Sequence, residues 1–270
     1  MIHWKMCLLK QQGVIDINYK VYIERIASVS RFEIKRSLFD RKLLLALAVI
    51  ILIMGISLIK VDFVISSAFG DRDYIGRLIR AATMGISFSS IIFASDSLVS
   101  EFETGSGLVL FTKPVSRNQV FIGKFISAYL CTFMMSIICY AIIITAASYK
   151  LGYVSENLWI SFLLTMLYIF AAVGVCMLFS SISNKGLVSI AAGLLVFFVL
   201  GMVIVESARE FGEPWYSLYY SVDAISNAVE EHSSAFVSVP DLTTSAAVMT
   251  MYGAFSSVFA AIIFNIRRQP

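Results

Sequence analysis

The residues with the most capacity for recognition chemistry lie in one polar segment, SEFETGSGLVLFTKPVSRNQVFIGK, between two apolar stretches. Glu101 and Glu103 place negative charge at its start, and Arg117 and Lys124 place positive charge at its end. Charges of both signs at the edges of a short turn are suited to ion pairs with a partner. Together with the glycines and a helix-start signal, these charges predict docking to a partner outside the membrane.

The backbone of the same segment is predicted to bend sharply. Gly105 allows conformations that other residues avoid, and Pro114 ends whatever structure precedes it. Ser116 and Gln119 match a capping box, which predicts that a helix begins there. Residues 108–111, which begin with Leu108 and end with Phe111, add a short apolar patch. A bent turn of this kind suits insertion into a partner, and from the residues alone an ordinary loop is an equal alternative.

Other residues that could take part in chemistry are scattered along the chain. The two histidines and four cysteines form no CxxC pair and no metal-binding spacing, so no metal site is expected. Asp96 is an isolated acid in an apolar block, where it could bond to a neighbouring helix or line an inner vestibule. Lys124 is expected near the inner end of a helix, with its ammonium reaching toward the membrane surface. Gly123–Lys124 is followed by phenylalanine and is not a phosphate-binding loop, so this chain is predicted to be no enzyme and to carry no cofactor.

Composition predicts a membrane protein. The chain is 59% hydrophobic and 14% charged, against about 45–50% and about 25% in soluble domains. A bilayer core of about 30 Å needs roughly 20 apolar residues in helical form. The expected spans are residues 43–58, 81–99, 120–148, 158–179, 186–205 and 243–266. The sequence therefore predicts an all-α integral membrane protein with a single six-helix transmembrane domain over residues 43–268.

The residues before the first span divide into an extension, 1–20, and an amphipathic segment, 21–42. In the second, an apolar stripe of Ile23, Ala27, Ser30, Ile34 and Leu38 opposes a basic face. This pattern predicts an interfacial elbow helix, and a solvated cytosolic helix is the alternative. Ser30 with Glu33 matches a capping box, which would mark a helix start or a kink.

The distribution of Lys and Arg predicts the orientation. Most of the 21 Lys and Arg residues lie in the segments that share a side with the N-terminus. The positive-inside rule then places both termini in the cytoplasm of a multi-pass protein of the cell membrane. Residues 61–79 are expected to form an external loop. The acidic stretch 206–242 is expected to be a second, longer outer loop.

The outer loop 206–242 contains an aromatic, amphipathic stretch. Trp215, Tyr219, Val222 and Ile225 recur at helical spacing, and Trp and Tyr favour the level of the lipid headgroups. An external amphipathic helix is therefore expected. It could be a gate over a substrate path or an anchoring cap.

The polar segment resembles the signature of type-2 ATP-binding-cassette (ABC) permeases, in which paired acids, a glycine, an apolar run and P-V-S-R precede G-K. The matching residues are Ser100, Glu101, Glu103, Gly105, Leu110, Phe111, Pro114, Val115, Ser116, Arg117, Gly123 and Lys124. Phe102 stands where the family prefers arginine, which makes a salt bridge to a partner doubtful there. The segment FEIKRSLFDRK is also similar to the family's elbow helix.

The resemblance implies that residues 100–119 form a cytosolic coupling helix that docks on a separate ATPase. It implies a transporter of two permeases, expected to be a homodimer in the bilayer, and two ATPase subunits that hold ATP and magnesium. The activity implied is export. The docking residues would be Glu101, Glu103, Gly105, Leu108, Phe111, Pro114, Ser116 and Arg117.

Three other classes of function can be weighed against this one. A self-sufficient secondary transporter or channel would need intramembrane charge pairs or broken inverted-repeat helices, and neither is clear in the sequence. A membrane scaffold could use the acidic outer loop to bind an external partner. An intramembrane enzyme would need a convergent set of catalytic groups, whereas Asp96 is isolated. No nucleic-acid partner is expected, and the substrate is not readable from the sequence.

Overall fold

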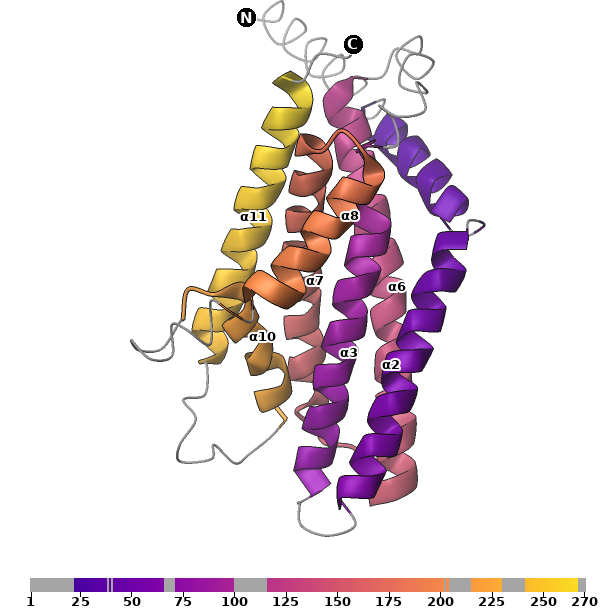
Figure 1. Ribbon diagram of the computed structural model, residues 1–270, viewed down its shortest axis with the longest axis vertical. Helices are drawn as coiled ribbons and strands as arrows, with labels where there is room; N and C mark the ends of the chain where they lie inside the picture. The colour runs from indigo at the N-terminus through magenta and orange to yellow at the C-terminus, as the bar shows by residue number, and fades with distance from the viewer. Residues whose placement is uncertain are drawn as a thin grey trace, which may run out of the picture.

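The structure is a computed structural model that describes residues 22–37, 39, 41–65, 71–99, 116–201, 203, 215–229 and 241–266. Every regular element within these ranges is a helix. The long helices lie side by side in an elongated bundle (Figure 1). The predicted all-α fold is therefore confirmed. The expected extension 1–20 lies outside the described residues.

Five helices are long and apolar enough to cross a bilayer. The shortest has 24 residues and the longest, α6, has 35. At 1.5 Å per residue these lengths reach about 36 and about 52 Å, more than the bilayer core of about 30 Å. The chain is therefore a multi-pass membrane protein. The five helices are α2 (Arg41–Ile65), α3 (Asp71–Ala94), α6 (Arg117–Leu151), α7 (Leu158–Ile182) and α11 (Leu242–Ile266).

The fifth span of the sequence prediction begins where expected but differs in character. Helix α8 (Gly186–Leu194) continues into a π-helix, η1 (Leu195–Leu200). Its apolar stretch, Gly186–Val199, is shorter than the five long helices. Figure 1 shows α8 crossing obliquely in front of α7, between α11 and α3. The count of six complete spans stays a prediction, because residues 204–214 are not described.

The predicted external loop at residues 61–79 is largely wrong. Helix α2 continues through Ile65, and α3 already begins at Asp71. The charged residues near the start of α3 suggested a loop, but apolar residues at helical spacing share one buried face. Those residues are Tyr74, Ile75, Leu78, Ile79 and Ala82, each at most 2% exposed.

A helix, here called the N-terminal helix, covers residues 22–37, within the segment that is expected to form the elbow helix. It is continuous across Ser30, so the prediction of a helix start there was wrong. The Ser30 hydroxyl donates to the carbonyl of Ile26 at 3.0 Å, one turn earlier, and lies 3.2 Å from the carbonyl of Gly123 on α6. Ser30 therefore faces α6 instead of capping a helix.

Helices α7 and α11 pack closely through small residues. A Cβ atom on Gly253 of α11 would overlap the ring of Phe170, and one on Gly174 of α7 would overlap the hydroxyl of Ser256. Small residues let helix backbones approach and gain dispersion contacts in lipid, where burial of apolar surface drives no association. This contact joins the last long helix to the centre of the bundle.

The expected amphipathic helix of the outer loop is α10 (Leu218–Asn227). It packs against α3, α7 and α11. Its buried side includes Ser221, Ala224 and Ile225, each 0% exposed. Such burial means that α10 is an integral part of the bundle.

Candidate functional site

The candidate docking segment, residues 100–119, follows α3 in the chain and ends in the first turn of α6. Its predicted contact residues Glu101, Glu103, Gly105, Leu108, Phe111 and Pro114 lie outside the described residues. Ser116 and Arg117, at the start of α6, are described. The end of α3 and the start of α6 therefore define the site.

The start of α6 carries the predicted capping box. The backbone N–H of Gln119 donates to the Ser116 hydroxyl at 3.4 Å, and the backbone N–H of Ser116 donates to Oε1 of Gln119 at 2.9 Å. Ser116 has the extended backbone of an N-cap residue, with φ −75° and ψ 152°. The capping box satisfies two backbone donors that would otherwise lack a partner. The first turn of α6 is thereby fixed.

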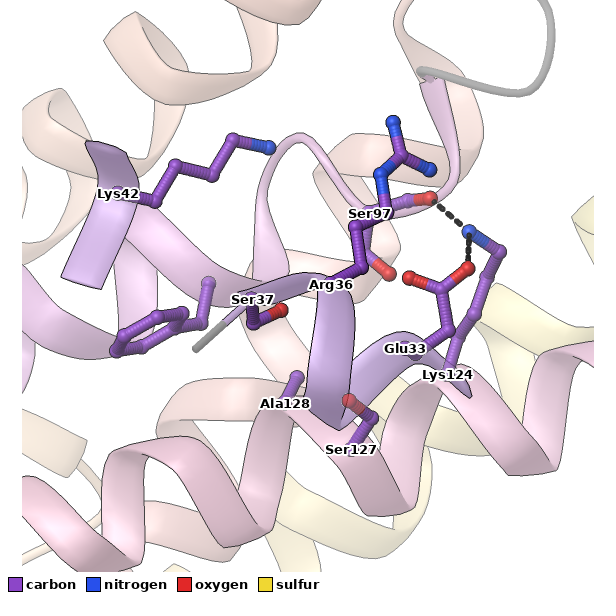
Figure 2. Close-up of a pocket in the computed structure, with 9 residues that line it drawn as sticks. Glu33, Arg36, Ser37, Lys42, Ser97, Lys124, Ser127 and Ala128 are labelled. Atoms are coloured by element: carbon purple, nitrogen blue, oxygen red, sulfur yellow. Dashed lines mark hydrogen bonds and ion pairs between the residues drawn. The ribbon is translucent and has the colours of Figure 1, made fainter. Parts of the chain in front are cut away.

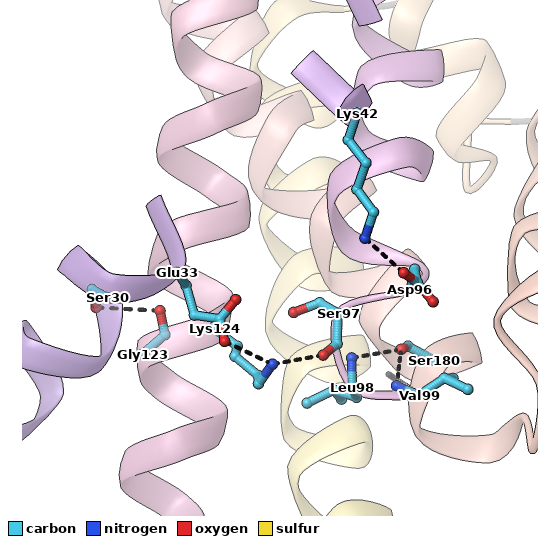
Figure 3. Close-up of polar contacts among 10 residues, drawn as sticks. All are labelled: Ser30, Glu33, Lys42, Asp96, Ser97, Leu98, Val99, Gly123, Lys124 and Ser180. Carbon is cyan, nitrogen blue, oxygen red and sulfur yellow. Dashed lines mark hydrogen bonds and ion pairs between the residues drawn. The ribbon is translucent and has the colours of Figure 1, made fainter. Parts of the chain in front are cut away.

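The end of α3 is held by a serine of α7. Regular helix stops at Ala94, and a tight turn follows over residues 95–98. The backbone N–H groups of Leu98 and Val99 donate to the Ser180 hydroxyl at 3.0 and 3.3 Å. Figure 3 shows this hydroxyl between the two amides. One side chain therefore anchors the backbone just before the docking segment begins.

Lys124 joins three parts of the chain. Its Nζ lies 3.1 Å from Oε1 of Glu33 on the N-terminal helix and donates to the carbonyl of Ser97 at 2.8 Å. Figures 2 and 3 show these two contacts converging on the ammonium group. The lysine side chain is 1% exposed and that of Glu33 is 13% exposed. The expectation that Lys124 extends to the membrane surface was wrong, because other segments of the chain supply its partners.

The burial of this charge makes its partners essential. The effective penalty for burying one ion is several kcal/mol, and it is offset only by good pairing and further hydrogen bonds. Lys124 has both an opposite charge and a carbonyl acceptor. The N-terminal helix, the end of α3 and α6 are thus held in one arrangement, because separating Lys124 from its partners would leave a buried charge uncompensated.

A glycine brings the N-terminal helix close to α6. A Cβ atom at Gly123 would lie 2.7 Å from Cγ1 of Val29, closer than real side chains pack. The missing side chain leaves room for Val29 and for the hydrogen bond from Ser30 to the Gly123 carbonyl. Gly123 and Lys124 therefore place the N-terminal helix in two complementary ways.

Asp96 forms a second ion pair, with Lys42 at the start of α2. The distance from Nζ to Oδ2 is 2.6 Å, and the side chains are 37% and 20% exposed (Figure 3). Of the two roles expected for Asp96, the bond to a neighbouring helix is confirmed. Because the pair is partly solvated, its contribution is about 0–1 kcal/mol.

The first turn of α6 is also tied to the last turn of α11. The amide of Asn265 donates to Oδ1 of Asn118 at 2.5 Å, and Nη1 of Arg117 donates to the Asn265 carbonyl at 3.4 Å. No sequence pattern indicated this link, because the two asparagines are far apart along the chain. Arg117 is therefore engaged within the bundle.

A small cavity lies beside the buried lysine. Its volume is about 20 Å³, enough for about one water molecule. Figure 2 shows Glu33, Arg36, Ser97 and Lys124 around it. A cavity of this size and polarity suits hydration of the ion pair. It is too small to be a transport site.

The four residues expected to form an outer gate do not share one surface. Tyr219 and Val222 line a cavity of about 410 Å³ next to α10. Trp215 is 63% exposed, and Ile225 is completely buried in the core. Two of the four residues therefore face a space of ligand size, while Ile225 holds α10 against the bundle.

Among the described residues, no cluster of three or more His, Cys, Asp or Glu residues could hold a metal ion. The three described cysteines, Cys131, Cys139 and Cys176, are buried free thiols. The polar groups that are brought together in the described ranges serve helix packing and helix ends.

A bundle of five helices long and apolar enough to cross a bilayer defines a polytopic membrane protein. Residues 27–215 match the model of the ABC-2 family transporter proteins. The match spans more than half of the chain, which therefore belongs to this family, and the resemblance seen in the sequence is confirmed. Comparison with curated proteins gives no match. The chain is accordingly a permease subunit of an ABC transporter, a class that associates with an ABC ATPase subunit.

Proposed function

We propose that this chain is the permease of an exporter driven by ATP that a separate cytosolic ATPase hydrolyses. Residues 100–119 would be the docking segment. The observation that carries the proposal is the double link from the buried Lys124, on α6, to the carbonyl of Ser97 and to Glu33. Because both flanks of the docking segment are joined by this group, a push on the segment would move α3 and α6 together.

The docking chemistry follows from the residue types of the segment. The acids would meet basic groups of the ATPase, and the apolar residues would enter a groove between its helices. Pro114 and the capping box at Ser116 would keep the segment short and stiff. The proposed contact residues are Glu101, Glu103, Gly105, Leu108, Phe111, Pro114, Ser116 and Arg117.

The proposed assembly has two copies of this chain and two ATPase subunits in the cell membrane. Both termini would face the cytoplasm, and the N-terminal helix would lie at the inner interface. Exposure of Phe32 and Phe39, at 63% and 84%, supports that placement, since aromatic rings on the outer face could enter the lipid. ATP and magnesium would bind the ATPase, and this chain would perform no hydrolysis.

The charge pairs of the bundle favour coupling over an independent ion pathway. A secondary transporter places its charged groups near the bilayer midplane. Lys42 is the second residue of α2, and Asp96 lies two residues beyond the last residue of α3. The Glu33–Lys124 pair involves the N-terminal helix and the first third of α6. Both pairs therefore lie at the end of the bundle next to the docking segment.

The test is co-expression of this chain with the ABC ATPase encoded beside it, followed by purification of the complex. Replacement of Glu103 by alanine or of Gly105 by proline should reduce complex yield or ATPase rate at least several-fold. Glu156→Ala is a matched control, because Glu156 is an exposed acid in the turn between α6 and α7. Wild-type yield and rate for both docking variants would refute the docking assignment.

A further inference from the structure

A cavity of ligand size lies in the bundle beside α10. Its volume of about 410 Å³ falls in the range of small-molecule sites, about 300–1,000 Å³. Residues from α3, α7, η1, α10 and α11 line it. It is thus built from segments far apart in sequence, and α10 forms one of its walls.

The inner walls of this cavity are apolar. They include Met84 of α3, Val175 of α7 and the consecutive residues Val196, Phe197 and Phe198 of η1. Phe198 stacks on Phe88 with ring centroids 4.4 Å apart. A π-helix is rare and often marks a functional site. Here it turns two neighbouring aromatic rings toward the same space, where an apolar guest would be well packed.

Three hydroxyl groups on these walls, from α3 and α7, already have hydrogen-bond partners. Thr83 donates to the carbonyl of Arg80 at 2.8 Å, and Ser87 donates to the carbonyl of Thr83 at 2.8 Å. Tyr168 and Ser87 share a further bond of 2.5 Å. A buried hydroxyl that loses its partner costs about 1–3 kcal/mol. Because these are satisfied within the protein, an apolar guest could lie against them without that cost.

One end of the cavity carries one positive and one negative side chain. Arg80 of α3 and Asp223 of α10 both line it. Nε of Arg80 donates to the Ser226 hydroxyl at 3.1 Å, and that hydroxyl donates to the carbonyl of Asp223 at 2.9 Å. A guanidinium and a carboxylate at one end favour a headgroup with no net charge, because a net charge would be attracted by one and repelled by the other.

Helix α10 is positioned by a glycine to close this space. A Cβ atom at Gly201, just after η1, would lie 3.1 Å from Cδ2 of Tyr219. The glycine therefore lets the start of α10 pack against the end of η1. Tyr219 and Val222 then reach the cavity from this helix. Any movement of α10 would change the volume available to a guest.

We propose that this cavity binds an amphiphile with an aliphatic or aromatic body and an uncharged or zwitterionic headgroup. The body would lie against η1, Met84 and Val175, and the headgroup would lie near Arg80 and Asp223. The occupant is either a bilayer lipid or the exported compound. Only the second identity rests on the proposed function, because it names the substrate class of the transporter.

The first test is photolabelling of the full-length wild-type chain with a single-chain phosphocholine lipid that carries a photoreactive group on its acyl chain. Mass spectrometry should locate the label on residues 80–87, 196–201 or 217–223. An excess of unlabelled lysophosphatidylcholine should abolish labelling there, and lysophosphatidic acid of the same chain length should compete at least several-fold less well. Labelling confined to lipid-facing positions such as Val258, which is 56% exposed, would overturn the proposal.

The second test fills the cavity. Val175→Trp places a large ring in the space and should lower saturable labelling at least tenfold. Val258→Trp makes the same change on an exposed face and should leave labelling unchanged. Val196→Trp provides an independent filling variant from η1 if the α7 variant fails to fold. Wild-type labelling in a folded filling variant would overturn the proposal.

The identity of the occupant and the proposed function are separated by an ATPase assay of the complex. An exported compound should change the ATPase rate in the wild type and lose this effect in the filling variant. A resident lipid should co-purify and leave the rate insensitive to added lipid. Specific labelling without any ATPase complex would support the cavity proposal and refute the proposed function. An active complex without specific labelling would support the proposed function and refute the cavity proposal.

Discussion

The ammonium of Lys124 lies 3.1 Å from the carboxylate of Glu33, and only 1% of the lysine side chain is exposed. The same group donates to the carbonyl of Ser97 at 2.8 Å. One buried charge is thus shared by the N-terminal helix, the end of α3 and the first third of α6. Since Ser97 and α6 flank the proposed docking segment, this relationship joins the two helices that would carry its motion.

Replacement of Lys124 by methionine should destabilise the protein by about 3–5 kcal/mol, because Glu33 is left buried without its counter-charge. The expected result is a clearly lower thermal unfolding temperature for the purified complex, measured by intrinsic fluorescence. Lys42→Met is the matched control, since its pair with Asp96 is partly exposed and contributes about 0–1 kcal/mol.

The pairing itself can be isolated with the double variant Lys124→Met, Glu33→Leu. This double variant should recover most of the stability lost in Lys124→Met, because the uncompensated charge has gone. If the stability lost in the double variant equals the sum of the losses in the two single variants, Lys124 and Glu33 do not interact.

Replacement of Gly123 by alanine should displace the N-terminal helix, since the new Cβ would lie 2.7 Å from Val29. Replacement of Gly55 by alanine should be neutral or stabilising by up to about 1 kcal/mol, because nothing lies within 4 Å of its Cβ position and alanine favours helix. Thermal unfolding of both variants checks the contrast. Val29→Ala should restore part of the loss in Gly123→Ala, and equal behaviour of the two glycine variants would contradict the packing argument.

Replacement of Ser180 by alanine should loosen the end of α3, because the amides of Leu98 and Val99 lose their acceptor. Hydrogen exchange at residues 95–99 should become at least tenfold faster, and stimulation of the ATPase by the permease should fall. Ser136→Ala is the control, since that buried hydroxyl bonds only to the carbonyl of Phe133 in its own helix. Unchanged exchange in Ser180→Ala would refute the anchoring role.

Replacement of Ser116 by alanine removes one half of the capping box and should cost about 1 kcal/mol. The effect should be local, with faster hydrogen exchange in the first turn of α6. Ser257→Ala, which alters a half-buried serine of α11 that bonds to its own helix, should change nothing measurable. Equal protection of the first turn in wild type and Ser116→Ala would show that the cap does not hold the helix start.

Local sequence patterns predicted the helices well where a pattern is compatible with one main structure. The apolar blocks of α6, α7 and α11 and the capping box at Ser116 were readable, since long apolar runs and S-x-x-Q spacing each have one main structural solution. The start of α3 was missed because its charges masked a buried apolar face. The signal was present in the spacing of Tyr74, Ile75 and Leu78.

The contacts of the site were much less predictable. Glu33 and Lys124 are both visible in the sequence, but no local pattern indicates that the two residues, 91 positions apart, come into contact. Ser30 and Glu33 were read as a cap because that pattern is local, whereas both side chains in fact face α6. The cavity beside α10 depends on five segments at once. Tertiary packing decides such features, and a single sequence carries little information about it.

The central claim is that the segment between α3 and α6 is where a separate ATPase attaches. Site-specific photocross-linking from position 112, in the complex co-expressed in intact cells, tests it most directly. Tyr153, exposed in the turn at the other end of α6, supplies the comparison position. We expect a covalent product with the ATPase from position 112 and none from position 153. Cross-linking from 153 but not from 112 would contradict the account.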